Sequence, residues 1–561
     1  MSYYKNLFKD KKEMSFFVNK ITDEILKHAC ESLKKNDTVT VINLNDHNLT
    51  SKGMRYISQL LLENENIKEL YLCKNQITAK GAKYISEALK KNKNLKVLDL
   101  SNDSLFSFEV VNKISEKGTK YLCEGLLLNN TLTDLNISFN KISSEGAKQI
   151  ALVLEKNTSL LNLNILNNEI NFDGCEAISK ALMENSTLKK LKLSGNTIGN
   201  EGGNILAKTL EMNKTLEMLE IAFCNIREEG GKNIANSLKL NNSLKILNIS
   251  NNKIKSSCIE FGEAIEINEN LIELNISDNF ISTENINKFS ENLSKSKSLS
   301  ILNISKNPIG DQGIKNISNA LNANGNKTLN EIKFNGVNLS DYGAKFLFNA
   351  LEENIHIKHI YLNENKLTKK TGEYIKNALI NNNTLNTLSL RKNNLGDEGC
   401  ELIANSLKEN TSLNFLFLEN NSISSHGAKF ILEAIENNTS IERVFLKTDS
   451  LFCENLIKKK CEDNIRNKNK DVGAGRFSLY VKKRASFTNG KNITLLNKVN
   501  YKAVSKGDSK ILEIQSNNEN EEKDVEEVNI IRNVNNEKKF ETRRYNFNNV
   551  KSGTPLQKKV L

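Results

Sequence analysis

The sequence has 561 residues, 38% of them hydrophobic, and no tryptophan; this is more chain than one compact core normally holds and points to several domains or a repeat array. The formal net charge is +12, and residues 462–561, with 21 Lys and Arg against 13 Asp and Glu, hold +8 of it, so the rest of the chain is nearly neutral. Nine scattered cysteines without a CxxC pair argue against a disulfide framework and favour reduced thiols.

The N-terminal segment predicts a cap rather than a targeting signal. MSYYKNLFKDKKEM lacks the apolar core of a secretory signal, and no stretch of the chain approaches the roughly 18 apolar residues of a membrane-spanning helix. We therefore expect a cytoplasmic protein without membrane insertion; association with the nucleus or the cytoskeleton stays open. Residues 15–35 carry apolar residues at a helical spacing, at Phe17, Ile21, Ile25 and Ala29. This spacing predicts a helical cap within residues 1–38.

An internal repeat occupies most of the chain. The pattern L-x-x-L-x-L-x-x-N-x-L recurs fifteen times, and eleven of the fourteen steps between copies are 28 residues long, the others being 37, 27 and 30. Its first positions are Val39, Ile67, Leu95, Leu132, Leu160, Leu188, Leu216, Leu244, Leu271, Leu299, Leu329, Ile357, Leu385, Leu413 and Ile441. A period of this length is typical of a solenoid, in which each unit packs only on its neighbours.

Each unit combines a strand with a helix. In residues 132–142 apolar residues alternate, which predicts a short strand with one buried face, whereas Ala147, Ile150 and Leu154 follow a helical spacing. Gly146 marks the start of this helix, and Asn157 is expected to close it in the left-handed conformation. Neither element can bury its apolar face alone. Stacked units predict a parallel sheet on the inside of a curve and helices on the outside.

The ninth position of the repeat is usually asparagine, and we expect its buried amide to bind backbone groups of the turn that leaves the strand. These residues are Asn75, Asn140, Asn168, Asn196, Asn252, Asn279, Asn307, Asn365, Asn393 and Asn421. Cys224 is an alternative at this position, and four repeats depart from it, with His47, Asp103, Val337 and Asp449.

This 28-residue unit, with glycine before the helix and asparagine in the turn, resembles the ribonuclease-inhibitor-type leucine-rich repeats. They occur in ribonuclease inhibitor, Ran GTPase-activating proteins, NOD-like receptors and dynein-regulatory-complex subunits. The resemblance covers residues 39–451 and implies an α/β horseshoe, a leucine-rich-repeat solenoid with a parallel concave sheet and convex helices. It also implies a protein that binds other proteins and has no family-wide catalytic motif, because the fold alone sets no function.

One repeat is nine residues longer than the others. The extra residues, FSFEVVNKI at 106–114, fall between a strand and a helix and predict a loop on one rim of the horseshoe. Two interpretations stay open, a loop that contacts a partner and a tolerated insertion.

The C-terminal fifth of the chain predicts a cap and a tail. Residues 452–470 form a helical pattern, with Leu456, Ile457 and Ile465 facing the last repeat. From Asp471 the periodicity vanishes, so we expect residues 471–561 to form a disordered, basic tail with an acidic stretch over Glu519–Glu527. Within it Ser486 in KKRAS and Thr554 before proline fit kinase motifs, and phosphorylation there would reduce the basic charge.

Residues that could carry out a reaction are scarce. The five histidines, His28, His47, His356, His359 and His426, form no HExxH motif and have no cysteine partner at a metal-ligand spacing. GAGRF at 473–477 lacks the preceding strand and the third glycine of a nucleotide-binding loop. We therefore expect no enzymatic activity, no small-molecule substrate, and no catalytic, cofactor-binding or metal-binding residues.

The concave face changes character along the array. Because strand side chains alternate, positions 3, 5 and 7 point outward. In the middle repeats position 5 is polar, with Asn136, Asn164, Lys192, Glu220, Asn248, Asn275 and Asn303. The C-terminal repeats place aromatic and basic residues on this face, at Tyr361, Arg391, Phe415, Phe417, Arg443 and Phe445. Such a set is typical of a binding hot spot, although cover by the tail or incidental exposure would also account for it.

These observations predict a non-enzymatic scaffold or adaptor that binds a protein partner on the concave face or the rim loops. One alternative is a GTPase-activating protein for a Ran-like GTPase; the basic tail argues against it, because that family typically carries an acidic tail. A second alternative is an axonemal or cytoskeletal regulatory subunit. Nucleic-acid binding is disfavoured because the tail lacks repeated Arg-Gly or aromatic spacing.

Overall fold

A computed structural model describes residue 4, residues 7–8, 10–16, 20–103 and 111–471, and four short strands between residues 504 and 542. The chain divides into two units, Met1–Ala474 and Gly475–Leu561. The predicted repeat array lies within the first unit.

Sixteen three-residue strands of the first unit form one parallel sheet in chain order. The strands are β1 (Glu13–Ser15), β2 (Val41–Asn43), β3 (Glu69–Tyr71), β4 (Val97–Asp99), β5 (Asp134–Asn136), β6 (Asn162–Asn164), β7 (Lys190–Lys192), β8 (Met218–Glu220), β9 (Ile246–Asn248), β10 (Glu273–Asn275), β11 (Ile301–Asn303), β12 (Glu331–Lys333), β13 (His359–Tyr361), β14 (Thr387–Ser389), β15 (Phe415–Phe417) and β16 (Arg443–Phe445). The central residue of almost every strand is buried and its two neighbours are more exposed, as the alternation predicts.

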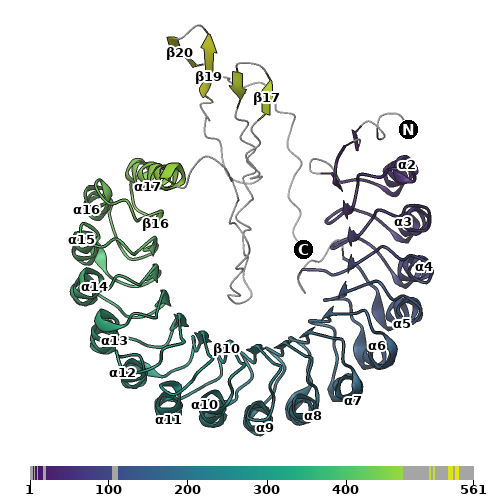
Figure 1. The fold of residues 1–561 in the computed structure, drawn as a ribbon, viewed down its shortest axis with the longest axis horizontal. Helices are drawn as coiled ribbons and strands as arrows, with labels where there is room; N and C mark the ends of the chain where they lie inside the picture. The colour runs from purple at the N-terminus through teal and green to yellow at the C-terminus, as the bar shows by residue number, and fades with distance from the viewer. Residues whose placement is uncertain are drawn as a thin grey trace, which may run out of the picture. The chain divides into compact units, whose positions relative to one another are not determined.

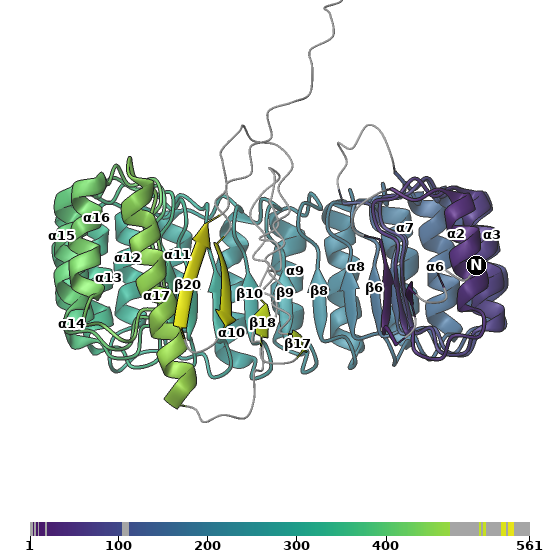
Figure 2. The ribbon, with the colours of Figure 1, turned by 90° about the horizontal axis from the view of Figure 1, so that it is seen from above.

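A helix follows every strand of this sheet. The helices are α2 (Asp23–Leu33), α3 (Ser51–Glu63), α4 (Ala79–Leu89), α5 (Ser115–Leu126), α6 (Ser143–Lys156), α7 (Phe172–Glu184), α8 (Gly199–Met212), α9 (Glu228–Leu238), α10 (Cys258–Ile267), α11 (Thr283–Leu293), α12 (Gly310–Ala320), α13 (Asp341–Glu353), α14 (Lys369–Asn381), α15 (Gly396–Leu407), α16 (Ser425–Ile435) and α17 (Leu451–Asp471), with a short 3-10 helix, η1 (Lys255–Ser257), before α10. The helices form the outer layer of the curve and the strands the inner one (Figure 1), and Figure 2 shows the helices side by side along the array.

The predicted α/β solenoid is confirmed, and its curvature has a simple cause. Strands stand about 4.8 Å apart whereas helices are wider, so stacked strand–helix units must bend toward the strands. The predicted helical face is buried, with Ala147 at 0%, Ile150 at 2% and Leu154 at 2% exposure. A β-carbon added at Gly174 would lie 2.9 Å from the Cβ atom of Ala147 in the preceding helix. Glycine near the helix start therefore allows neighbouring helices to approach closely.

The N-terminal cap differs from its prediction, because the array begins one unit earlier. Strand β1 pairs with β2, and Met14 at its centre is fully buried, so residue 15 ends a strand rather than beginning a helix. The helix begins at Asp23, where the Thr22 side chain accepts a hydrogen bond from the Ile25 backbone N–H. Ile25 itself is half-buried. Of the other predicted cap residues, Ile21 and Ala29 are buried, and Phe17 lies outside the described residues.

The ninth-position asparagines form the predicted buried ladder. Asn168 is typical: its Nδ2 donates to the Ile137 carbonyl at 3.0 Å, and its Oδ1 accepts from the Asn140 backbone N–H at 2.8 Å. Cys224 substitutes in part, since its Sγ lies 3.5 Å from the Leu193 carbonyl oxygen. Each side chain thus satisfies backbone groups of the preceding repeat, where no regular strand hydrogen bond reaches.

The repeat with the nine-residue insertion also has an asparagine in this ladder. The position of that asparagine shows that the insertion was misplaced by the sequence analysis. Asn112, not Asp103, takes the ladder position, because its Nδ2 donates to the Leu72 carbonyl at 2.9 Å and its Oδ1 accepts from the Ile77 N–H at 3.0 Å. The nine extra residues therefore fall at 103–111 rather than at 106–114. Asn102 supports the base of the loop by accepting from the Asn112 N–H at 2.8 Å. Residues 104–110 lie outside the described residues.

A second asparagine ladder runs along the N-terminal ends of the strands, where each helix leads into the next strand. The prediction of a left-handed Asn157 is wrong, because its backbone is extended, with φ −80° and ψ 128°. Its Nδ2 donates to the carbonyls of Leu126 and Asn129 at 2.9 and 2.8 Å, and its Oδ1 accepts from the Leu160 N–H at 2.9 Å. The same role falls to Asn64, Asn92, Asn129, Asn185, Asn213, Asn241, Asn268, Asn326, Asn354, Asn382, Asn410 and Asn438. Asparagine side chains therefore link neighbouring repeats at both ends of the strands.

Helix α17 closes the C-terminal end of the array. Its Asn464 continues the second ladder, donating from Nδ2 to the Asn438 and Ile441 carbonyls at 2.8 Å each. Of the three residues predicted to face the last repeat, Ile457 is buried, whereas Leu456 and Ile465 are half-buried. The buried face instead joins Ile457 to Cys453 and Cys461. This helix covers the outer edge of β16, which would otherwise stay unpaired.

The second unit is described only in part. Strand β17 (Val504–Lys506) pairs with β18 (Ser509–Ile511), and β19 (Asn529–Val534) pairs with β20 (Glu537–Thr542), both antiparallel. The rest of the predicted tail, with Ser486 and Thr554, lies outside the described residues.

Candidate protein-binding surface

The C-terminal end of the concave face gathers the predicted aromatic and basic side chains on four neighbouring strands. We call this set the C-terminal concave patch: Tyr361 in β13, Arg391 just after β14, Phe415 and Phe417 in β15, and Arg443 and Phe445 in β16. The strand register places Phe415 beside Arg443 and Phe417 beside Phe445. The even spacing within each strand keeps all these side chains on the outward face.

The centre of the patch is a stack of two rings and a guanidinium group. The rings of Phe417 and Phe445 are parallel within 3°, with their centres 4.5 Å apart. The Arg391 Cζ atom lies 4.5 Å from the Phe417 ring centre and 5.6 Å from the Phe445 centre. The structure thus brings together three of the six predicted residues, in an arrangement that favours both stacking and cation–π attraction.

Glu419 holds this stack in place, and the sequence analysis did not single it out. Its carboxylate accepts from Arg391 Nε at 2.8 Å and pairs with Arg391 Nη2 at 2.7 Å. A two-point contact of this kind fixes the plane of the guanidinium group. Glu419 occupies position 7 of the repeat, so the same alternation that selected Arg391 could have found it.

The remaining members surround the stack rather than join it. Tyr361 lies two strands from Phe417, because Ser389 stands between them in the register, and its ring carries Lys333 Nζ at 5.6 Å. Phe415 is half-buried beside the exposed Arg443. Next to them His359 Nδ1 lies 2.9 Å from Thr387 Oγ1.

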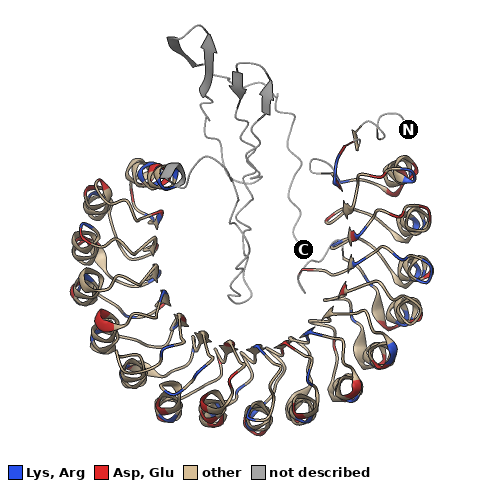
Figure 3. Cartoon of the chain, in the orientation of Figure 1, with Lys and Arg blue, Asp and Glu red and all other residues tan. Residues whose placement is uncertain are grey.

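The opposite end of the concave face is acidic. Glu69, Asp99 and Asp134 stand on the neighbouring strands β3, β4 and β5, and Tyr71 donates from its hydroxyl to Glu69 at 2.7 Å. Burial, together with the Glu69 carboxylate, raises the pKa of Tyr71 above its usual range. On the outer helices charges of both signs are mixed (Figure 3). The concave face therefore has ends of different charge.

Comparison with known proteins supports the repeat assignment. A family model described as Leucine Rich repeat matches residues 35–58, 63–86, 128–151, 184–206, 213–235, 295–318 and 381–404. These segments coincide with units of the parallel sheet and its outer helices. The fold is a leucine-rich-repeat solenoid.

Solved structures with similarity to this solenoid include the yeast Rad7–Elc1 complex, at 16% identity over 72% of this chain and 85% of that chain, with a TM-score of 0.40. An internalin (inlF) from Listeria monocytogenes matches at 17% identity over 73% of this chain and 92% of that chain, with a TM-score of 0.35. Leiomodin-1 actin-binding site 2 matches at 25% identity over 28% of this chain and 86% of that chain, with a TM-score of 0.23. None of the curated proteins compared with the chain matches it.

Reactive or metal-binding groups do not gather on the described part of the leucine-rich-repeat solenoid. No group of three or more His, Cys, Asp or Glu side chains there could hold a metal ion. All nine cysteines are free, and burial raises the pKa of Cys123, Cys175, Cys224 and Cys400 to about 12, so these thiols stay protonated. No helix among the described residues is long and apolar enough to cross a bilayer.

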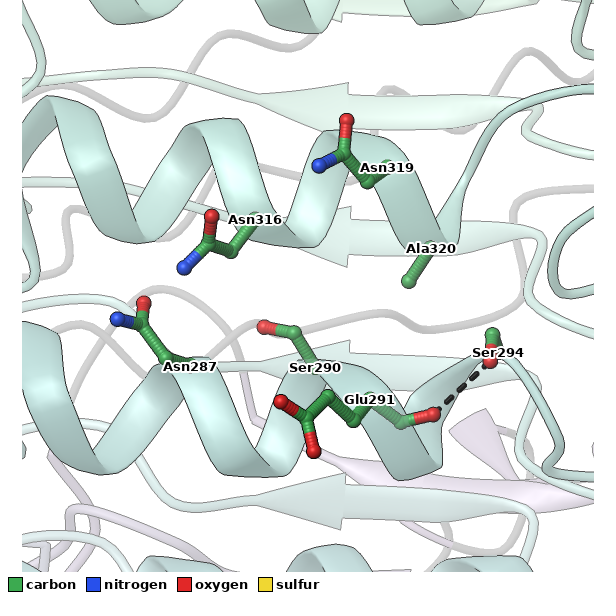
Figure 4. Close-up of a pocket in the computed structure, with 7 residues that line it drawn as sticks. All are labelled: Asn287, Ser290, Glu291, Ser294, Asn316, Asn319 and Ala320. Carbon is green, nitrogen blue, oxygen red and sulfur yellow. Dashed lines mark hydrogen bonds between the residues drawn. The ribbon is translucent and has the colours of Figure 1, made fainter.

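A hollow of about 310 Å³ lies on the convex side of the solenoid, between α11 and α12 (Figure 4). It adjoins the 30-residue repeat, in which α12 ends early at Ala320. The lining is polar and consists of Asn287, Ser290, Glu291, Ser294, Asn316, Asn319 and Ala320. Within it the Ser294 hydroxyl donates to the Glu291 backbone carbonyl at 2.9 Å.

Proposed function

We propose that this chain is a non-enzymatic scaffold that binds a protein partner on its C-terminal concave patch. Leucine-rich repeats in general act as protein-interaction scaffolds, and the geometry of this chain supports one location for the contact. The observation that carries the proposal is the stack of Phe417 and Phe445 beside Arg391, at a repeat position that is polar in the middle of the array. The ribonuclease-inhibitor type and a cytoplasmic location belong to the same proposal.

Physical chemistry favours this patch as the energetic centre of an interface. Aromatic and arginine side chains dominate binding energies, the aromatic ones because they bury a large area with few rotatable bonds and arginine because its planar group both stacks and hydrogen-bonds. Here the rings and the guanidinium group are already ordered by one another and by Glu419. Binding therefore costs these side chains less conformational entropy than it would at a surface of unrestrained side chains.

An affinity pulldown from native lysate tests the proposal. The baits are the intact chain, residues 1–470, and a triple variant in which Phe415, Phe417 and Phe445 become serine. A matched control replaces Phe223 and Phe280, whose exposed fractions are 51% and 58%, with serine. We expect a partner that is retained by the truncation and by the control and lost by the triple variant.

Two results would contradict the proposal. If every partner survives the triple variant, the patch is not the binding surface. If partners are lost with residues 471–561 but are indifferent to the substitutions, the second unit carries the binding. Circular dichroism of each bait separates loss of binding from loss of folding, and we expect equal helical signals because the three rings are only half-buried.

A further inference from the structure

Two exposed cations lie at the end of the C-terminal concave patch, Arg443 of the patch itself and Lys447 beside it. Arg443 and Lys447 lie two residues before and after Phe445, so all three share one face of the chain, with the cations about 7 Å from the ring position along the strand. Both side chains are exposed, and neither forms an ion pair within the described part of the chain.

Three other cations of the concave face have a carboxylate close by. Lys192 lies 3.0 Å from Glu220, Lys333 lies 3.2 Å from Glu331, and Arg391 lies 2.7 Å from Glu419. In these three cases the positive charge is paired within or across repeats. The two unpaired cations stand where the aromatic stack ends.

The stack ends at Phe445. Arg391 lies over both rings, with its Cζ atom 4.5 Å from the Phe417 centre and 5.6 Å from the Phe445 centre, and Phe445 belongs to β16, the last strand of the sheet. Phe445 is only half-buried, and no further strand of this sheet adds a side chain to the stack. An incoming apolar or aromatic side chain can therefore pack against Phe445 between two cations.

We infer that the patch recognises an acidic peptide segment of a partner protein, in which an aromatic or large aliphatic side chain is flanked by Asp or Glu. The apolar side chain packs on Phe445, and the flanking carboxylates pair with Arg443 and Lys447. This inference rests on the proposed function and adds the chemistry of the partner. The acidic strands β3 to β5 repel such a segment, so it stays at the C-terminal end of the concave face.

A nucleic acid fits the same surface less well. Stacked rings beside cations can bind single strands, but such proteins offer a continuous positive track for successive phosphates. Here the two cations without an ion pair in the described part of the patch region, Arg443 and Lys447, stand four residues apart at one end of the stack. The other cations beside the rings are paired with carboxylates, so a continuous track for successive phosphates is missing.

Selection from a random displayed peptide library tests the inference, with the full chain as bait. The variant baits are Arg443→Gln with Lys447→Gln, and Phe417→Ser with Phe445→Ser. The control is Lys190→Gln, which removes an exposed cation at the same repeat position as Arg443 but on β7. Synthetic peptides from the enriched clones are then measured by fluorescence anisotropy at low and high salt, with their glutamine and asparagine analogues and with a single-stranded oligothymidine.

We expect enriched clones that place Phe, Trp or Leu within two residues of Asp or Glu. Their affinity should fall about tenfold or more on the Arg443/Lys447 double variant and on the neutral peptide analogue, and it should weaken at high salt. The Lys190 control should bind as the unchanged chain does. In combination, the variant and the analogue should lose little more than either alone, because both remove the same charge pair.

Every other outcome overturns the inference, and the outcomes differ in what they mean for the proposed function. Neutral or basic clones that need Phe417 and Phe445 would leave the patch as the binding surface but reject an acidic partner. Clones that ignore all variants would reject the patch itself. No enrichment on the full chain would reject peptide recognition and leave the proposed function to the pulldown. Oligothymidine that displaces the peptides would assign the patch to nucleic acid.

Discussion

The concave face shows two different surfaces on one backbone. In β9, β10 and β11 the fifth position carries Asn248, Asn275 and Asn303, and each side-chain oxygen accepts a hydrogen bond at 3.1 Å from the backbone N–H two residues ahead. In β15 and β16 the same position carries Phe417 and Phe445, whose rings stack on each other. The strands are equally short and pair in the same register.

The difference shows where binding energy can reside. An asparagine that closes a hydrogen bond on its own turn presents little apolar area and has one fewer acceptor to offer. Phenylalanine cannot make that bond, so its ring stays on the surface and covers apolar area only through its neighbours. The backbone geometry is thus the same in every repeat, and the residue at the fifth position decides whether a repeat can contribute to partner binding.

The largest effect is expected when the C-terminal surface is converted into the middle one. Phe417→Asn with Phe445→Asn should weaken the partner isolated by pulldown by about a hundredfold or more, because both central anchors are removed. The melting temperature should change little, since the asparagines can adopt the turn hydrogen bond seen at Asn275. Calorimetric titration with the purified partner and a thermal melt check both parts. Unchanged affinity would mean that the two surfaces do not differ in function.

In the middle repeats we expect substitutions to affect stability rather than binding, and the buried ninth-position asparagine to matter more than the one on the concave face. Asn279→Ala removes a fully buried amide that donates to the Ile249 carbonyl at 3.0 Å and accepts from the Asn252 N–H at 2.8 Å. We expect it to lower the free energy of unfolding by about 3 kcal/mol, because buried backbone groups lose their partners. The matched control Asn275→Ala should cost less than about 1 kcal/mol. Urea denaturation measures both, and equal losses would contradict the distinction.

A smaller effect should follow when the stack keeps its rings but loses its cation. Arg391→Met retains length and apolar contact with Phe417 while removing the cation–π contact and the pair with Glu419. Partner affinity should fall about tenfold, since rings without the guanidinium group are less ordered. Lys392→Met serves as the control, because Lys392 pairs with Glu364 in the turn and not with the rings. If the two variants weaken binding equally, Arg391 acts only through its charge.

The smallest effect concerns the N-terminal end of the ninth-position ladder, where a titrating group replaces the neutral amide of the middle repeats. His47 Nδ1 accepts from the Ile21 N–H at 3.3 Å, and burial lowers the pKa of His47 below its usual 6.5. The unfolded chain then binds the proton more readily, so stability is fully present above pH 6.5 and declines as the pH falls below it. Hydrogen exchange of α2 at pH 5 and pH 8 should show this loss. His47→Asn should abolish it, and a loss that persists in this variant would point to another group.

Much of this protein follows from the sequence because its repeats are local. Alternating leucines define each strand and show which side chains point outward. The 28-residue step stacks each strand on the next and so places Phe417 beside Phe445 without any knowledge of the coordinates. The ninth-position amide could likewise be assigned a role, since a turn after a short strand leaves backbone groups that need partners.

The tertiary structure decided what depends on contacts between repeats. The sequence pattern alone misplaced the insertion, because only the hydrogen bonds of Asn112 to Leu72 and Ile77 show which asparagine joins the ladder. It missed the second ladder, since a side chain that caps the neighbouring repeat looks from the sequence like a helix terminator. The strand at Glu13–Ser15 was hidden because Lys11 stands where the fifteen recognised copies have an apolar first residue. The contact of Arg391 with Glu419 also needed coordinates, because alternation tells which face a side chain occupies but not which neighbour across 28 residues it will bind.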